Sequence, residues 1–332
     1  MNQSQSVSAA VPEASSKPQI SVCIITCNQD RYIRQCVDSA LVQAVDVSLE
    51  ILIGDDCSQD DTSSILMELA AANPRLIRHI RHDPRLGACQ NSQSILALAK
   101  GRFIAHLDGD DYWLPGKLKE QLAFMLANPD CAAVYTNALT VTEAGDTIGL
   151  FNDVGRQRFD LAAMLRKGNF LNTSSIMVRS ELVSHVIDID EPFIDYRAHL
   201  RYARSGFLAQ LETPLVGYRV SSVGSMVFSS NDLVRQLYWD AIMDVPRDLV
   251  TDLDFAQGLA DFSRRVAFRA MNTQRWSLLR KWLPLVFETS PFGKIRTALL
   301  ILWAIARMAY LEIVGRLPSI TGRKRVKVLY RR

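Results

Sequence analysis

The sequence lacks the marks of several common protein classes. It has no G-x-x-x-x-G-K-[ST] motif, which argues against a P-loop NTPase. Its net charge of +3 is too small to indicate nucleic-acid binding. It has no internal repeat and no C-x-x-C spacing, and its six cysteines all lie in the first 131 residues. We therefore interpret the cysteines as small core residues of a protein from a reducing compartment.

The amino-terminal segment has little apolar content. It is rich in Ser, Ala and Gln, so we predict a disordered lead over residues 1–18 and no signal peptide. The whole chain is 48% hydrophobic and 22% charged, which is typical of a folded protein. At 332 residues it has room for one large domain and an appendage.

Strand-like and helix-like segments alternate in the first part of the chain. The predicted strands are residues 20–26, 49–53, 76–80, 103–107 and 131–135, and the predicted helices are residues 32–41, 63–72, 88–99 and 115–128. Strands separated by helices predict right-handed crossovers, and therefore an α/β fold with a mainly parallel sheet and flanking helices. We assign residues 19–230 to this domain and residues 231–290, where helical periodicity returns, to a helical extension.

Acidic residues directly follow two of the predicted strands. The segment Asp108–Asp111 ends one strand, and the pair Asp55 and Asp56 ends another. The carboxyl ends of parallel strands meet at the edge where open α/β folds bind ligands. Crowded carboxylates raise one another's pKa unless a cation lies between them. This pattern indicates a site for Mg²⁺ or Mn²⁺.

Three motifs mark the ends of the first, second and fourth predicted strands. They are residues 21–28 (SVCIITCN), 55–62 (DDCSQDDT) and 107–111 (LDGDD). Their order and spacing resemble a family 2 glycosyltransferase with a GT-A fold, over residues 19–226. The resemblance implies an enzyme that moves a sugar from a nucleoside-diphosphate sugar to a hydroxyl acceptor and inverts the anomeric centre.

The resemblance assigns a role to each carboxylate of the acidic cluster. Asp110 matches the principal metal ligand, and Asp108 matches the carboxylate that contacts the ribose or the metal. Asp111 would assist them indirectly. A solvated turn before the next helix is the alternative interpretation of this cluster.

The nucleoside is assigned to the ends of the first two strands. Asp56 matches the residue that binds the base, and Thr26 and Asn28 lie on the adjoining loop. Asp55 is a weaker candidate, and helix capping is the alternative for both carboxylates.

The loop before the third helix supplies further candidates. Gly87 and Asn91 fit the family's loop, where glycine lets the backbone approach the ligand. Arg85 departs from the asparagine that is common in the family, and either contacts phosphate or is solvated. Ser221 stands where many relatives have a histidine. His106, just before the acidic cluster, is interpreted as a partly buried strand residue.

A candidate catalytic base precedes a later helical stretch. Asp195, before residues 197–204, matches the family's carboxylate in this position. An ordinary helix N-cap is the alternative, and Asp188 and Asp190 are runner-up bases. The segment 171–175 resembles the family's acceptor-facing loop.

The last segment, residues 291–332, is apolar and then basic. Residues 297–306 are nearly all apolar, but ten residues are too few to span a bilayer and Arg307 follows them. Arg296, Trp303, Arg307 and Tyr310 suit a helix in the membrane interface, with the basic tail attracted to anionic lipid. Packing of this helix on protein is an equal alternative.

The sequence thus predicts a metal-dependent inverting glycosyltransferase of polysaccharide or glycolipid assembly. Its partners would be a nucleoside-diphosphate sugar, a glycan or lipid-linked acceptor and an anionic membrane, but not nucleic acid. It would be cytoplasmic and peripheral on the inner face of the cell membrane. One alternative is a sugar-nucleotide pyrophosphorylase, although residues 26–31 lack the glycines of its phosphate loop. Another is a catalytically silent binding subunit of a membrane assembly.

Overall fold

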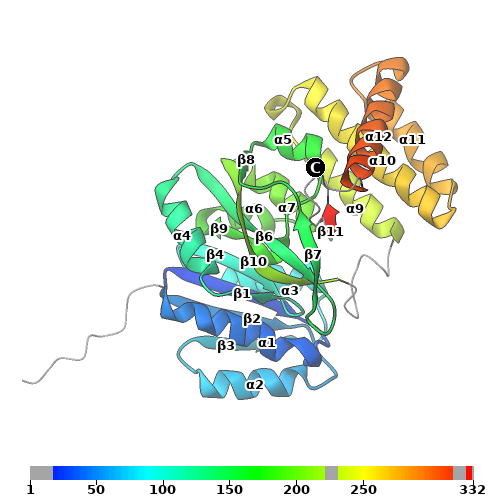
Figure 1. Ribbon diagram of the computed structural model, residues 1–332. Coiled ribbons are helices and arrows are strands. Elements are labelled where there is room, and N and C mark those ends of the chain that lie inside the picture. The colour runs from blue at the N-terminus through cyan, green and yellow to red at the C-terminus, as the bar shows by residue number, and fades with distance from the viewer. Residues whose placement is uncertain (1–17, 221–230, 317–326, 331–332) are drawn as a thin grey trace, which may run out of the picture.

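The computed structural model describes residues 18–220, 231–316 and 327–330. A mixed sheet forms the centre of this part of the chain, and helices cover both of its faces (Figure 1). Residues 1–17 of the predicted lead, Ser221 and most of the predicted basic tail lie outside the described residues.

The sheet contains five strands that the sequence predicted and six that it did not. Its strands are β1 (Ile20–Thr26), β2 (Leu49–Asp55), β3 (Ile77–Arg81), β4 (Phe103–Asp108), β5 (Tyr112–Trp113), β6 (Cys131–Val141), β7 (Thr147–Asn152), β8 (Gln157–Phe159), β9 (Met177–Arg179), β10 (Phe207–Arg219) and β11 (Lys327–Tyr330). They run in the order β11-β7-β6-β9-β4-β1-β2-β3, and β10 pairs with β5, β6 and β8.

The described part of the α/β domain has seven helices, and the sequence predicted all of them except Leu161–Lys167 and Ser184–Ile187. They are α1 (Asp30–Leu41), α2 (Thr62–Ala72), α3 (Ala88–Leu98), α4 (Lys117–Ala127), α5 (Leu161–Lys167), α6 (Ser184–Ile187) and α7 (Asp195–Tyr202). The extension adds α9 (Asn231–Met243), α10 (Asp252–Thr273), α11 (Ser277–Thr289) and α12 (Lys294–Arg316). Short 3-10 turns lie at η1 (Val42–Val45), η2 (Thr173–Ser175), η3 (Ser180–Leu182) and η4 (Arg247–Leu249). The predicted α/β domain with a helical carboxyl-terminal extension is confirmed.

Each face of the sheet packs against its own hydrophobic core. Alternate residues of β1, such as Val22 and Ile24, face a core shared with α1, α2 and α4. Cys23, on the other face of β1, joins a core that takes in α3, α6, α7 and the helical extension. Because successive side chains of a strand point to opposite faces, the continuous apolar sequence of β1 suits burial on both sides.

The central strands are parallel, so their carboxyl ends meet at one edge. β1 pairs with β2 on one side, Thr26 opposite Asp55, and with β4 on the other, Ile25 opposite Asp108. The prediction that both acidic clusters lie at the same edge of the sheet is therefore confirmed.

Two strands depart from the simple alternation of strand and helix. The short β9 inserts antiparallel between β4 and β6, and the long β10 runs parallel to β6 with register shifts around Pro214. Proline cannot donate to the ladder, so an irregular register at this point is expected. β10 carries the chain back to the acidic edge, where Arg219 ends it.

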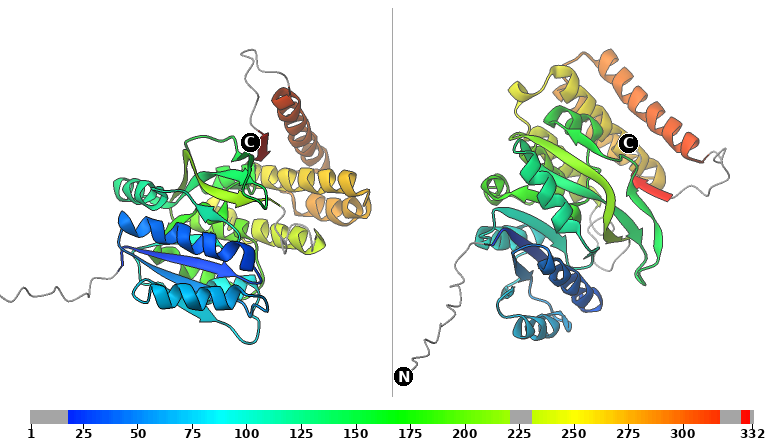
Figure 2. Two further views of the ribbon diagram at one scale, coloured as in Figure 1. Left: turned by 60° about the horizontal axis from the view of Figure 1, so that its bottom comes forward. Right: turned by 60° about the vertical axis from the view of Figure 1, so that its left-hand side comes forward.

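The extension lies against the α/β domain and not apart from it. α9, α10 and α11 gather on the side of α5 and α7, and α12 lies outermost against α10 (Figure 2). β11 then adds to the sheet edge parallel to β7, a strand that the predicted basic tail did not include. The extension and the domain consequently share one core.

The last long helix is longer than the sequence suggested. Arg307 does not interrupt α12, which runs over 23 residues. Its segment Lys294–Val314 is the one helix in the described residues that is long and apolar enough to cross a membrane, with a mean hydropathy of 1.7. The sequence analysis judged residues 297–306 too short to span a bilayer, but the whole helix is long enough.

Candidate active site

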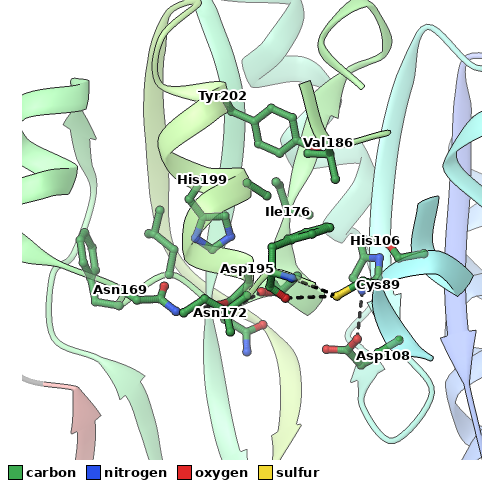
Figure 3. A pocket seen from close by; sticks show the side chains of 18 of the residues that line it. Cys89, His106, Asp108, Asn169, Asn172, Ile176, Val186, Asp195, His199 and Tyr202 are labelled. Carbon is green, nitrogen blue, oxygen red and sulfur yellow. Dashed lines mark hydrogen bonds and ion pairs between the residues drawn. The ribbon is translucent and has the colours of Figure 1, made fainter. Parts of the chain in front are cut away.

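A cavity of about 500 Å³ opens at the carboxyl edge of the sheet. Ile25 of β1 and Asp108 of β4 lie at its acidic side (Figure 3). Asp195 and His199 of α7 line it further on, and Arg235 of α9 is contributed by the extension. The residues around it are far apart in sequence, so only the fold brings them together.

Ser174 hydrogen-bonds to two carboxylates of the acidic cluster. Its hydroxyl donates to Asp111 at 2.6 Å and lies 3.1 Å from the carboxylate of Asp108. The backbone N–H of Arg219 donates to the other carboxylate oxygen of Asp111 at 2.9 Å. Asp111 is buried beneath the cluster, and its indirect role stays a prediction.

Position 109 of the acidic cluster requires glycine, because the end of β1 lies very close to it. A Cβ at Gly109 would lie 2.8 Å from the Cβ of Thr26 and 2.4 Å from Oε1 of Gln29. Thr26 Oγ1 also donates to Gln29 at 2.8 Å. The missing side chain thus lets the acidic turn sit directly against the end of the first strand.

The electrostatics of the cluster suit a bound cation. Burial, together with the charges of Asp110 and Asp108, raises the pKa of Asp111 well above its usual value. Burial acts in the same direction on Asp108, but His106 and Ser174 outweigh it and lower the pKa of that carboxyl. His106 lies 3.0 Å from Asp108 through Nε2, so this strand histidine is paired with the cluster.

A divalent ion could be held by Asp110 and Asp108 from this cluster. Among the described residues no three His, Cys, Asp or Glu side chains converge as a complete ligand set. Mg²⁺ commonly uses one or two carboxylates together with substrate phosphates, so the two neighbouring carboxylates of Asp110 and Asp108 fit this ion. Asp108 lines the cavity, whereas Asp110 is outside its lining.

Arg219 closes the cluster from the end of β10. Its guanidinium donates to the backbone carbonyl of Asp110 and to Gln35, and lies over the rings of Tyr32 and Tyr112 at 4.7 Å and 5.3 Å. This buried cation fixes the turn that presents Asp110. Arg219 was not among the candidate residues of the sequence analysis.

Asp56 is engaged with the loop before α3. Its carboxylate accepts the N–H of Leu86 at 2.6 Å and of Gly87 at 2.9 Å, and pairs with Arg85 at 3.3 Å. Gly87 has a φ of +87°, which favours glycine and turns the chain into the helix. Arg85 thus pairs with the candidate base-binding residue while its side chain stays largely exposed, and a contact with phosphate stays a prediction.

The remaining nucleoside candidates shape the strand-end loops. The side-chain oxygen of Asn28 accepts the N–H of Gln59 at 2.8 Å, and the backbone N–H of Asn28 donates to Ser58 Oγ at 3.0 Å. Asp55 is buried under this loop. Burial tends to raise its pKa, but bonds from His79, Ser58 and Ser63 outweigh it and hold the pKa below its usual value. Asp55 thus holds the loop after β2 in place, which is consistent with its being the weaker of the two nucleoside-binding candidates.

Asn91 lies beneath the sheet edge and away from the cavity. It is buried, and its side-chain N–H donates to the carbonyl of Gly54 at 2.9 Å. It is not among the residues that line the cavity. Its assignment to the nucleotide sugar remains a prediction.

Asp195 lies in the cavity wall at the first residue of α7. Its two oxygens accept bonds of 2.8 Å each from Asn169 Nδ2 and Thr173 Oγ1. It also accepts the N–H of Tyr196 at 2.8 Å, so it supports the helix start as well as facing the cavity. The runner-up residues Asp188 and Asp190 are exposed and outside the cavity lining.

The segment predicted to face the acceptor connects the two halves of the site. Thr173 holds Asp195, and the next residue, Ser174, holds Asp111 and Asp108. The sequence analysis named the segment but not these bonds. A serine or threonine among apolar residues is too common for the sequence to have distinguished them.

A mainly parallel sheet covered by helices, with acidic residues at its carboxyl edge, is typical of a GT-A fold. The model of the family described as "Glycosyl transferase family 2" matches residues 21–178, which include β1, the acidic cluster and η2. Residues 21–178 of the chain therefore belong to this family. The predicted family and fold are confirmed.

Relatives and solved structures agree with this assignment. An uncharacterized protein of Mycobacterium tuberculosis is 30% identical over 223 residues, which cover 67% of this chain and 64% of the relative. Chondroitin synthase of Pasteurella multocida is 37% identical over 131 residues, 40% of this chain and 13% of that enzyme. This chain therefore spans under two thirds of the length of these relatives.

The crystal structure of S. aureus TarS, residues 1–349, in complex with UDP-GlcNAc has a similar fold. It superposes with a TM-score of 0.64 at 16% identity and covers 93% of this chain and 96% of its own. At this identity the similarity establishes the fold. It extends over most of this chain and so is not confined to the matched domain.

Proposed function

We propose that this protein transfers a sugar from a nucleoside-diphosphate sugar to a hydroxyl acceptor, with inversion, in polysaccharide or glycolipid assembly. The observation that carries the proposal is the placement of Asp195 and Asp108 in one cavity. One carboxylate belongs to the acidic edge and the other is held on a separate helix, where a base can face the acceptor. Family 2 membership and the UDP-GlcNAc complex of TarS support a nucleotide-sugar donor.

Different residues of the chain bind the nucleoside and remove the acceptor proton in an inverting transfer. The loop ends around Thr26, Asn28 and Asp56 bind the nucleoside, and Gly87 keeps the loop before α3 close to them. Asp195 takes the proton of the acceptor hydroxyl as it attacks the anomeric carbon. The bonds from Asn169 and Thr173 hold that carboxylate in place, which favours a single geometry of attack.

We assign Asp110 and Asp108 as the residues that hold Mg²⁺ or Mn²⁺. When bound, the ion neutralises charge that develops on the leaving diphosphate. Asp111 supports Asp108 through Ser174, and Arg219 fixes the backbone of Asp110.

We also propose that α12 lies in the interface of an anionic membrane, which places the protein on the cytoplasmic face. Ile301 of this helix is buried against the protein, with Leu300, Ala304 and Ile305 beside it. Its other side exposes an apolar stripe of Ile295, Leu299, Leu302, Tyr310 and Ile313, each at least 61% exposed. The two alternatives of the sequence analysis are therefore compatible, because one face packs on protein while the other is open to lipid.

A thermal-shift screen of nucleoside-diphosphate sugars, with Mn²⁺ or Mg²⁺ and with EDTA, tests the enzymatic proposal. A donor should raise the unfolding temperature only with metal, because ligand binding stabilises the folded state by mass action. Asp110→Ala should abolish this metal-linked shift, whereas the matched control Asp146→Ala, on an exposed turn, should retain it. The proposal fails if no donor binds the wild-type protein with either metal.

The same preparation distinguishes the alternatives. Slow hydrolysis of the bound nucleotide sugar to free sugar and nucleoside diphosphate supports a transferase. Release of pyrophosphate from a sugar 1-phosphate and a nucleoside triphosphate would instead identify a pyrophosphorylase. Donor binding without any turnover, over a broad set of acceptors, would identify a silent binding subunit.

A further inference from the structure

A buried histidine of α7 presents unused hydrogen-bonding atoms to the cavity. His199 is 1% exposed and lines the cavity one helical turn after Asp195. Neither of its ring nitrogens has a hydrogen-bond partner. Unpartnered buried polar atoms are rare in native proteins, because leaving one unbonded is costly. Their position in a cavity wall points to a ligand that supplies the missing bonds.

The ring of His199 is fixed by packing and is uncharged. Tyr135 meets it edge to face, with ring centroids 5.1 Å apart. Burial lowers the pKa of His199 to about 4, although the negative charge of Asp195 opposes this and the charge of His106 adds to it. At neutral pH the ring therefore offers one N–H donor and one lone-pair acceptor. A charged partner is not needed to satisfy it.

A second buried polar atom lies in the wall of the same cavity. The side-chain oxygen of Asn172, a residue only 4% exposed, has no hydrogen-bond partner. Asn172, His199 and Asp195 all line the cavity, and Figure 3 shows them in one view. An alcohol hydroxyl both donates and accepts, so it can satisfy an imidazole nitrogen and an amide oxygen alike.

The position of His199 assigns this ligand to the acceptor side. The donor side is marked by Asp108 and Ile25 at the acidic edge of the sheet. Residues four apart share one face of a helix, so His199 stands beside Asp195, the residue that faces the acceptor hydroxyl. A saccharide carries further hydroxyl groups next to the one that reacts.

We propose that His199 and Asn172 form a subsite that binds hydroxyl groups of a saccharide acceptor, adjacent to the hydroxyl that Asp195 deprotonates. The inference rests on the proposed glycosyl transfer. His199 and Asn172 are positioning residues: they fix the acceptor by neutral hydrogen bonds and take no proton from it. Apolar neighbours in the wall, such as Ile176, Val186 and Phe193, exclude water from these bonds.

Steady-state kinetics on the full chain test the subsite. With UDP-GlcNAc as donor probe and a panel of methyl glycosides as acceptors, His199→Phe should raise the acceptor KM about 3- to 10-fold. Hydrolysis of the donor by water should stay unchanged. His199→Asn, which can donate and accept, should recover part of the loss. His185→Phe is the matched control, because His185 lies outside the cavity lining. An unchanged acceptor KM, or an equal loss of hydrolysis, would overturn the subsite.

Binding can also be measured without turnover, which separates this inference from the proposed function. In protein labelled with ¹⁵N-histidine, addition of the methyl glycosides with UDP and Mg²⁺ should move the ring-nitrogen signals of His199. The same shift is expected in Asp195→Asn, and it should be lost in Asn172→Ala for glycosides that use both groups. A shift without any sugar transfer would support the subsite and defeat the proposed function. No shift with any glycoside would overturn the subsite.

Discussion

Ser174 and Asp111 form a hydrogen bond of 2.6 Å beneath the acidic turn. The same hydroxyl lies 3.1 Å from Asp108, so one side chain supports two of the three carboxylates. Ser174 is fully buried, and no other residue of the described chain donates a side-chain hydrogen bond to Asp111. The organisation of the site consequently depends on a serine of η2, the turn between α5 and β9.

We predict that Ser174→Ala weakens the acidic cluster without removing a carboxylate. Loss of the hydroxyl leaves Asp111 with an unsatisfied buried oxygen and should cost about 1–3 kcal/mol of unfolding free energy. The metal concentration needed for half-maximal donor binding should rise. Chemical denaturation and Mn²⁺ titration measure the two effects. Ser175→Ala, also buried, is the control that should leave the metal titration unchanged.

We predict that Asp195→Asn spares donor binding and stops transfer. Asparagine can retain the bond from Thr173 to its oxygen but cannot accept the acceptor's proton. General-base catalysis contributes about 100- to 10,000-fold, so turnover should fall by that order. Equilibrium binding of the donor and single-turnover kinetics check the two halves of this prediction. Full turnover in the variant would show that another group is the base.

The folding stability should depend on His199 between pH 4 and 6.5. Its pKa is about 4 in the folded protein and about 6.5 when unfolded. The unfolded chain therefore binds the proton first as pH falls, so stability is lost from about pH 6.5 down to about pH 4. This component amounts to at most about 3 kcal/mol. In His199→Phe the fall in unfolding free energy over this range should be shallower, as urea titrations at several pH values would show.

Asp244 should anchor the helix that carries the candidate base. It pairs with Arg197, Arg201 and Arg204 at 3.0, 2.7 and 2.5 Å. Burial tends to raise the pKa of Asp244, but these arginines outweigh it and hold the pKa below its usual value. Asp244→Ala removes the carboxylate partner of Arg201 and Arg204 and leaves Arg197 paired only with Glu191, so it should cost about 3–5 kcal/mol of unfolding free energy.

The unfolding free energy lost in Asp244→Ala should decrease as the pH falls. A carboxyl with a depressed folded-state pKa contributes stability above the unfolded value of about 4, and this is lost as the pH falls towards the folded value. The difference between wild type and Asp244→Ala should thus shrink below about pH 4. Asp240→Ala, one turn earlier on α9, is the control. An equal effect of the two substitutions would exclude the anchoring role.

We predict that the apolar stripe of α12 drives membrane binding. Leu299 and Leu302 are each 61% exposed, and replacing both by glutamate puts charge where the acyl boundary would lie. Binding to phosphatidylglycerol vesicles should fall at least about 10-fold by co-sedimentation. Leu249→Glu, at an exposed apolar residue outside the stripe, should leave binding unchanged. Unaltered vesicle binding by the double variant would rule out this surface.

The sequence predicted the part of the fold that rests on long periodic segments. β1, β2 and β4 are continuous apolar runs and α1 has one apolar face, so their positions followed directly. The three-residue β9 and the irregular β10 did not, because their pairing depends on partners distant in sequence. Strand order is a tertiary property that no local pattern contains.

The sequence predicted the charged residues of the candidate site but not the residues that hold them in place. Carboxylates at strand ends, such as Asp108, could be located because charge seldom ends an apolar run by chance. Ser174 and Arg219 could not, since their roles arise from contacts made 63 to 109 residues away in sequence. His199 was not among the predicted site residues, because its significance comes from burial without a hydrogen-bond partner.

The cavity wall draws on both sides of the point where the family match ends, at residue 178. The acidic edge lies before that point, whereas Asp195, Arg235 and Tyr238 lie after it. Both the acidic cluster and the candidate base are thus needed to complete the cavity, and they come from the two sides of that point. A chimera joined at residue 178 would therefore separate Thr173 from Asp195 and Asn172 from His199, so the two stretches have to be exchanged together.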